Sequence, residues 1–167
     1  MTTAQALFLA MYIAILIGAA LNDAREFRIS NAFPVALLIL FVVGAAAGIV
    51  PVVHIGSHVA HFGVALIGGM SLYSIGWFGG GDAKLYAATA LFVPFGDGWF
   101  LLLWIALAGF GLLVVTMIWR VLSAMFTSST PTRRQGIRKI DRRIAYGIAI
   151  AIGGVGAITT SANSVIF

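Results

Sequence analysis

Two aspartates beside strongly hydrophobic sequence are the residues of this chain best suited to chemistry. Asp82 directly follows three consecutive glycines, Gly79 to Gly81. Asp23 lies in the sequence N-D-A-R-E-F-R-I-S-N, at the end of the first apolar run. Two carboxyl groups held close together cannot both ionise cheaply, so one keeps its proton and the pair offers a general base and a general acid. Such a pair can hydrolyse a peptide bond, because one carboxyl activates water while the other polarises the scissile carbonyl.

Purely structural roles for the same acids are the alternative. Asp82 follows a glycine turn, where its carboxylate could cap a helix by accepting hydrogen bonds from free backbone amides. Asp23 could pair with Arg25 or Arg28, and Glu26 is a second acid close to it. The glycines favour the chemical interpretation, because a backbone without side chains can approach a substrate closely.

The composition indicates an integral membrane protein of one domain, residues 1–167. The chain is 61% hydrophobic and only 9% charged, and its mean hydropathy is +1.06, whereas a soluble domain is about half apolar and a quarter charged. Most of the net charge of +5 lies in one loop, which indicates membrane topology and not nucleic-acid binding. The sequence contains no cysteine, so thiolate catalysis, disulfides and cysteine-ligated zinc are excluded.

The apolar segments predict an all-α bundle of six transmembrane helices. The fourth helix has about a dozen residues and rises only ~18 Å, less than the ~30 Å of a hydrocarbon core. We therefore expect it to lie low within the bundle or to gain length from flanking residues. The expected helices span residues 3–21, 33–50, 58–78, 82–93 and 99–125, with the last starting near residue 144.

The basic residues predict the orientation of the bundle. Six spans place three loops on one side, residues 22–32, 79–84 and 127–143. All ten Lys and Arg lie in these loops or, as Arg120, at an adjoining helix end. The positive-inside rule then places the three loops in the cytoplasm and both termini outside. Asp23 and Asp82 should therefore lie near the cytoplasmic membrane boundary.

Three stretches of the chain match the pattern of a known protein family. D-A-R-E-F-R-I-S-N is similar to D-x-R-x-x-x-I-P-N, with Ser30 in place of the usual proline. G-G-G-D-A-K-L contains the GxGD tetrapeptide and has Lys84 in the usual basic position. Residues 144–154 are similar to I-P-Y-G-x-A, with Ala145 where proline is common. The chain thus resembles the type IV prepilin peptidases, which are GxGD-type intramembrane aspartyl proteases, and most of all their short, peptidase-only branch that serves tight-adherence (Flp) pili.

This resemblance implies an activity and a set of site residues. Asp23 and Asp82 would be the two catalytic aspartates, and the substrate a pilin or pseudopilin precursor with a short basic leader, cleaved after a glycine at the cytoplasmic face of a prokaryotic inner membrane. No cofactor or metal is implied, and we expect cleavage without the cysteine zinc module of the larger relatives. The residues expected to bind substrate or shape the site are Gly79, Gly80, Gly81, Lys84, Tyr146 and Gly147.

Other functions remain open on the sequence alone. The acids could carry protons or cations in a small transporter or channel subunit, or cap helices in a non-catalytic pilus-assembly subunit, and an archaeal preflagellin peptidase is a close variant of the protease. His54, His58 and His61 are spaced to share a helical face and could bind zinc. They fall on the far side from the acids with no carboxylate adjacent, so we expect interfacial histidines and no metal. The oligomeric state is left open.

Overall fold

The computed structural model describes residues 2–126 and 146–161, and these form six α-helices and two short 3-10 helices without any strand. The predicted all-α bundle of six helices is confirmed. The α-helices are α1 (Thr3–Glu26), α2 (Ala32–Ala46), α3 (Ile55–Ser74), α4 (Gly80–Ala90), α5 (Gly98–Phe126) and α6 (Tyr146–Thr160), and the 3-10 helices are η1 (Val52–His54) and η2 (Phe95–Asp97). The basic loop 127–143 lies outside the described residues.

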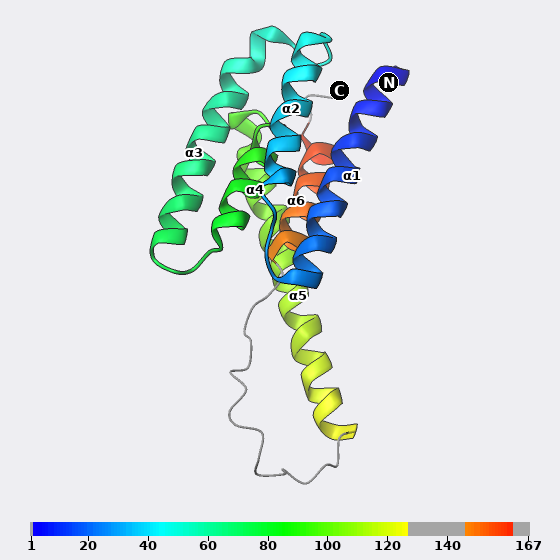
Figure 1. Ribbon diagram of the computed structural model, residues 1–167, viewed down its shortest axis with the longest axis vertical. Coiled ribbons are helices and arrows are strands. Elements are labelled where there is room, and N and C mark those ends of the chain that lie inside the picture. The colour runs from blue at the N-terminus through cyan, green and yellow to red at the C-terminus, as the bar shows by residue number, and fades with distance from the viewer. Residues whose placement is uncertain (1, 127–145, 162–167) are drawn as a thin grey trace.

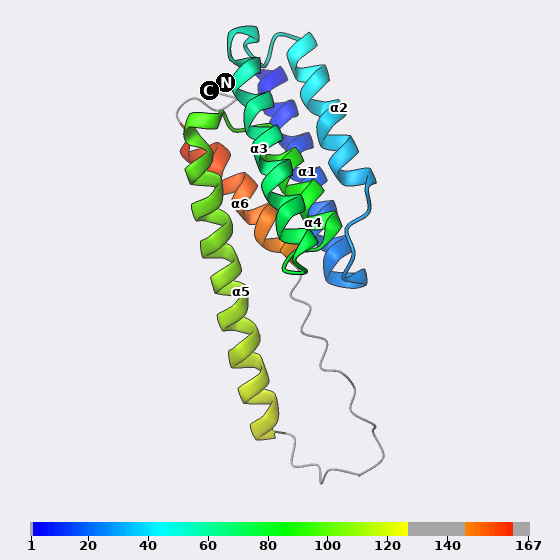
Figure 2. The same cartoon turned by 90° about the vertical axis from the view of Figure 1, so that its left-hand side faces the viewer.

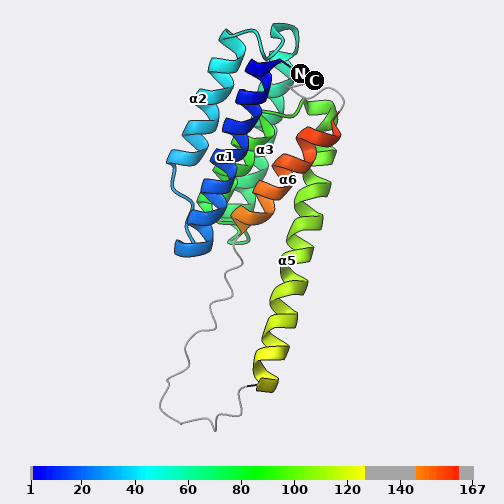
Figure 3. The ribbon, with the colours of Figure 1, turned by 90° about the vertical axis from the view of Figure 1, so that its right-hand side faces the viewer.

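The helices run alternately up and down, with the short α4 enclosed by its neighbours (Figure 1). α4 packs against α2, α3 and α6, and α6 also packs against α1 and α5. α6 runs obliquely between α1 and α5 (Figure 3), while α2 and α3 lie on the other side of α4 (Figure 2). The end of α1, the start of α4 and the start of α6 therefore meet at one end of the bundle, beyond which α5 projects (Figures 1 and 2).

Within residues 2–126 and 146–161, three helical segments are long and apolar enough to cross a membrane, and the chain is a membrane protein. These segments are α1, α3 and residues Phe95–Ser123, which include most of α5. α2 and α6 are apolar but have 15 residues each, and α4 has 11. α4 is thus even shorter than expected, and it sits within the bundle, as the sequence predicts for a helix too short for the hydrocarbon core.

Two of the three histidines anchor the far end of α4. The Nδ1 atom of His58 lies 2.9 Å from the carbonyl oxygen of Leu91, and that of His61 lies 2.8 Å from the carbonyl oxygen of Val93. A carbonyl oxygen can only accept a hydrogen bond, so each Nδ1–H donates one to the chain just after α4, where carbonyls lack helical partners. No group of three potential metal-binding side chains occurs in residues 2–126 and 146–161. The two hydrogen bonds show that His58 and His61 position the end of α4.

Tyr12 provides a prediction about the stability of this core. Its side chain is fully buried, its ring centroid lies 4.5 Å from that of Phe92, and its hydroxyl has no hydrogen-bond partner among the described residues. A buried hydroxyl without a partner costs free energy. We expect Tyr12→Phe to raise the free energy of unfolding by about 1–2 kcal/mol, seen as a higher melting temperature in detergent micelles. A lower melting temperature would show that the hydroxyl is bonded.

Candidate active site

Asp23 is held in the last turn of α1, which extends to Glu26 and so passes the expected end at residue 21. Its side chain is only 4% exposed. α1 ends because Phe27 takes the left-handed conformation, with a φ of 50°, and its backbone amide donates to the carbonyl oxygen of Asp23 at 2.8 Å. The carboxyl group of Asp23 accepts one hydrogen bond, at Oδ2 from the backbone amide of Gly147, at 2.7 Å. The start of α6 thus fixes the orientation of this carboxyl.

Gly147 can occupy this place only because it has no side chain. A Cβ atom there would lie 2.9 Å from both Cβ and Oδ2 of Asp23, and 3.0 Å from Cδ1 of Ile29. Contacts this short require neighbouring atoms to move. The contact therefore depends on glycine, and Gly147, expected to shape the site, lies directly against Asp23.

We expect Gly147→Ala to lower peptide cleavage at least about a hundredfold, because a displacement of about 1 Å at a reacting group costs that much. Gly111→Ala in α5 is the matched control, since a Cβ at Gly111 meets no atom within 4 Å. The measurement compares the initial cleavage rates of Gly147→Ala and Gly111→Ala at equal amounts of each protein in the membrane. Equal rates would show that Asp23 tolerates the shift.

Asp82 is held at the start of α4 by the glycine turn. Gly79 is the N-cap and Asp82 is the third helical residue, so Asp82 does not occupy the N-cap position, although its carboxylate accepts from a free amide as the capping alternative expected. Its Oδ2 accepts a hydrogen bond from the amide of Gly79 at 3.2 Å. Ala83, the residue after Asp82, packs closely against Gly69 of α3. This is possible because Gly69 has no side chain, since a Cβ there would lie 3.1 Å from that of Ala83. The hydrogen bond from Gly79 and the close packing of Ala83 on Gly69 together set the position of Asp82.

The two acids line one cavity of about 280 Å³, although they come from different helices. Asp23 enters it from the end of α1 and Asp82 from the start of α4. The turn after α1 and the glycine turn line the rest of the cavity. The lining residues are Asp23, Phe27, Arg28, Ile29, Gly79, Gly80, Gly81 and Asp82.

The structural alternatives for Asp23 are not realised within the described residues. These contain no ion pair, so Asp23 bonds neither Arg25 nor Arg28, although Arg28 lines the same cavity. Glu26 is exposed and does not line it. In this part of the chain each of the two aspartates makes one side-chain hydrogen bond, through Oδ2. Their Oδ1 atoms thus have no protein partner there and remain available to water or to a bound peptide.

The three glycines before Asp82 differ in what they tolerate. A Cβ at Gly81 would lie 2.9 Å from the backbone oxygen of Ile29, and one at Gly79 would lie 2.5 Å from Oδ2 of Asp82. A Cβ at Gly80 would make only ordinary contact, 3.4 Å from the ring of Tyr73. The third glycine is therefore required by packing against backbone, a side chain at the first would displace the Asp82 carboxyl, and the second is not restricted, in keeping with the pattern G-x-G-D.

Three of the expected site residues do not line the cavity: Gly147, which nevertheless binds Asp23, and the side chains of Lys84 and Tyr146. Lys84 donates from Nζ to Oδ1 of Asn31 at 3.1 Å, and it lines a separate, mainly apolar hollow between α2, α3 and α4. Tyr146 is 37% exposed, and its ring centroid lies 5.7 Å from that of Phe78. Both side chains therefore brace the chain around the site, joining α4 to the start of α2 and α6 to the turn before α4.

The sequence reasoning missed the role of Ile29. This residue is 9% exposed and is wedged between two of the glycines, with its backbone oxygen near Gly81 and its Cδ1 near Gly147. It thereby joins the turn after α1 to both α4 and α6. The isoleucine of the D-x-R-x-x-x-I pattern was a signal for such a role, but nothing in the sequence alone indicated its neighbours.

Comparison with known proteins identifies the family of the chain. The model of the type IV leader peptidase family matches residues 10–128, which include Asp23, Asp82 and the whole glycine turn. Comparisons with curated proteins and with solved structures found no match. The family match covers well over half of the sequence, and members of this family are peptidases that act on leader peptides. The chain belongs to the type IV leader peptidase family.

Proposed function

We propose that this peptidase is an intramembrane aspartic endopeptidase that removes the short cytoplasmic leader from pilin or pseudopilin precursors. The observation that carries the proposal is the meeting of Asp23 and Asp82 in one small cavity, each with a carboxyl oxygen free of protein partners in the described residues. The family match supports leader peptides as the substrate class. Two carboxyl groups in one site supply the base and the acid that hydrolysis of a peptide needs.

The chemistry consumes one water and restores the pair. The ionised carboxyl takes a proton from water, whose oxygen forms a bond with the scissile carbonyl carbon. The protonated carboxyl gives its proton to the carbonyl oxygen, which becomes a hydroxyl in the tetrahedral intermediate. When the C–N bond breaks, the leaving nitrogen takes the proton held by the first carboxyl and the hydroxyl returns its proton to the second. The cavity of about 280 Å³ has room for a water, which occupies ~30 Å³, and for one peptide unit.

The position of the cavity supports cleavage at the cytoplasmic membrane boundary. The cavity lies where α1 ends and α4 begins, at one end of the bundle (Figure 1). Arg25, Arg28 and Lys84 lie in the same two segments, and basic residues of this kind mark the cytoplasmic side of a membrane protein. In the proposed orientation the chain sits in the cytoplasmic membrane of a prokaryote, and a precursor with a cytoplasmic leader and an apolar helix meets the acids at the junction of these two parts.

The test is cleavage of a precursor by the purified protein. The protein in liposomes is mixed with a tagged pilin precursor, and the products are mapped by mass spectrometry. The expected result is one cut directly after the glycine that ends the leader, with no cut in a precursor in which that glycine is replaced by a bulky residue. An intact precursor together with proton or cation flux through the same liposomes would contradict the proposal and favour a transporter.

A further inference from the structure

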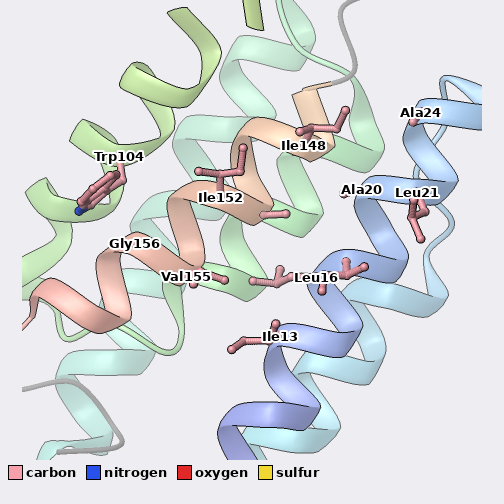
Figure 4. Close-up of a pocket in the computed structure, with 12 residues that line it drawn as sticks. Ile13, Leu16, Ala20, Leu21, Ala24, Trp104, Ile148, Ile152, Val155 and Gly156 are labelled. Carbon is pink, nitrogen blue, oxygen red and sulfur yellow. The ribbon is translucent and has the colours of Figure 1, made fainter. Parts of the chain in front are cut away.

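An apolar groove runs between α1 and α6 (Figure 4). One edge follows α1 from Ile13 to Ala24, and the other follows α6 from Ile148 to Gly156. Because the two helices are antiparallel, Ala24 and Ile148 lie together at one end of the groove and Ile13 and Gly156 at the other, as the close-up shows. The groove has a volume of about 580 Å³, and the length of α1 along it corresponds to about three helical turns, or ~16 Å.

The groove ends beside the candidate active site. Ala24 is the residue after Asp23, and Ile148 is the residue after Gly147, whose amide binds the carboxyl of Asp23. The same pair of helix ends therefore closes the groove and positions one of the two acids. The end of the groove and the cavity are thus lined by neighbouring residues of α1, Ala24 and Asp23, although no residue lines both.

The lining determines what kind of molecule fits. Apart from the Trp104 indole, which already donates to Thr160 at 3.0 Å, its side chains carry no polar group. Ala20 and Ala24 are small and not buried, which lets another backbone come close. A peptide in such an apolar place must satisfy its own backbone hydrogen bonds, so it must be a helix. A single hydrophobic helix, followed or preceded by a segment that enters the cavity, matches both features.

We propose that this groove, between α1 and α6, binds the hydrophobic helix of the precursor and so brings its leader junction to Asp23 and Asp82. The proposal rests on the proposed function, because it takes a precursor of this form as the substrate. It assigns to α1 and α6 both the recognition of the apolar helix and the positioning of Asp23. The groove thereby selects substrates by an apolar helix that ends at the membrane boundary.

A second groove on the molecule provides the control. It lies between α1 and α2, has a volume of about 440 Å³, and is lined by apolar side chains such as Leu7, Met11 and Ile39. It follows the first half of α1, so it lies toward the end of the bundle away from the acids. A lipid chain fits either groove, whereas the proposed substrate helix has a reason to occupy only the one that ends beside Asp23.

Site-specific cross-linking separates these occupants. A photoreactive phenylalanine analogue is placed at Ile152 in the first groove or at Ile39 in the second, which are 48% and 58% exposed. Both are made in an Asp82→Asn background, so that precursor is not consumed, and adducts are identified by mass spectrometry. We expect precursor adducts through its apolar helix from Ile152 and few from Ile39. Equal yields from both positions, or adducts from Ile152 only to lipid, to a second copy or to residues of this chain, would overturn the proposal.

Filling the groove gives a second, independent readout. We expect Ile152→Trp to lower kcat/KM for the full precursor at least about tenfold, while leaving unchanged the cleavage of a short soluble peptide that contains the leader junction but no apolar helix. Ile39→Trp should affect neither substrate. Equal losses by Ile152→Trp on both substrates would overturn the docking proposal, since the effect would then arise at the acids. Failure of the unsubstituted protein to cut either substrate would instead contradict the proposed function, and the cross-linking result would still decide the groove.

Discussion

Asp23→Asn and Asp82→Asn should each abolish cleavage of a pilin precursor, with losses of at least about a thousandfold in rate. Asparagine keeps the size of aspartate but can neither take a proton from water nor supply one to the carbonyl oxygen. Asp82 makes its side-chain hydrogen bond with the amide of Gly79 and Asp23 with that of Gly147, and both bonds use Oδ2. An amide oxygen can accept the same bonds, so both variants should still fold. Single-turnover cleavage in liposomes, with equal protein in the membrane, measures the loss.

Glu26→Gln is the matched control for these two variants. Glu26 lies three residues after Asp23, and its substitution by glutamine removes the same negative charge. Unlike Asp23, Glu26 is exposed and does not line the cavity. The cleavage rate of Glu26→Gln should stay within about twofold of that of the unsubstituted protein, because a change at an exposed surface residue is usually close to neutral. Normal cleavage by either asparagine variant, or a loss by Glu26→Gln as large as theirs, would remove that aspartate from the chemistry.

The second large effect is expected from the glycine turn. Gly81→Ala should lower cleavage at least about a hundredfold, because its methyl group would lie 2.9 Å from the backbone oxygen of Ile29 and would push the turn after α1 away from α4. The two acids sit on these two segments, so their separation must change. Gly80→Ala makes only ordinary contacts with Tyr73 and should keep nearly full activity.

This neighbouring pair makes the glycine test specific. Both substitutions add the same methyl group to the same turn, at adjacent residues, and differ only in what that group meets. Activity of the two variants is compared together with their melting temperatures, which report damage to the fold. If Gly80→Ala is as inactive as Gly81→Ala, the turn needs glycine for its flexibility and not for its packing against Ile29.

Much of the fold could be predicted from the sequence because membrane helices are defined by local features. Runs of apolar residues predict six helices, and the positions of the basic residues predict that Asp23 and Asp82 lie at the same end of the bundle. The structure has six helices, and both aspartates line one cavity. The motifs also pointed to Gly147, which proved to touch Asp23. These predictions depend on hydrophobicity, charge and motif spacing, which can all be read along the chain.

The parts that could not be predicted depend on contacts between distant segments. α1 ends at Glu26 because Phe27 adopts a left-handed conformation, which is uncommon for a residue with a side chain. The wedge of Ile29 between two glycines joins three separate stretches of sequence. Lys84 was expected in the site because of its motif, yet its bond to Asn31 places it in another hollow. Sequence spacing cannot indicate such partners, since packing alone selects them.

Asp23 and Asp82 are proposed to act together on one peptide bond, and a comparison of single and double substitutions tests this cooperation. Single-turnover cleavage of a precursor is measured for the original protein, for Asp23→Asn, for Asp82→Asn and for the variant that carries both. Residues that work as one unit lose the whole effect when either is removed. We therefore expect the double variant to cleave the precursor no more slowly than the slower of the two single variants. A double variant whose loss equals the product of two modest single losses would show two independent contributions and would contradict it.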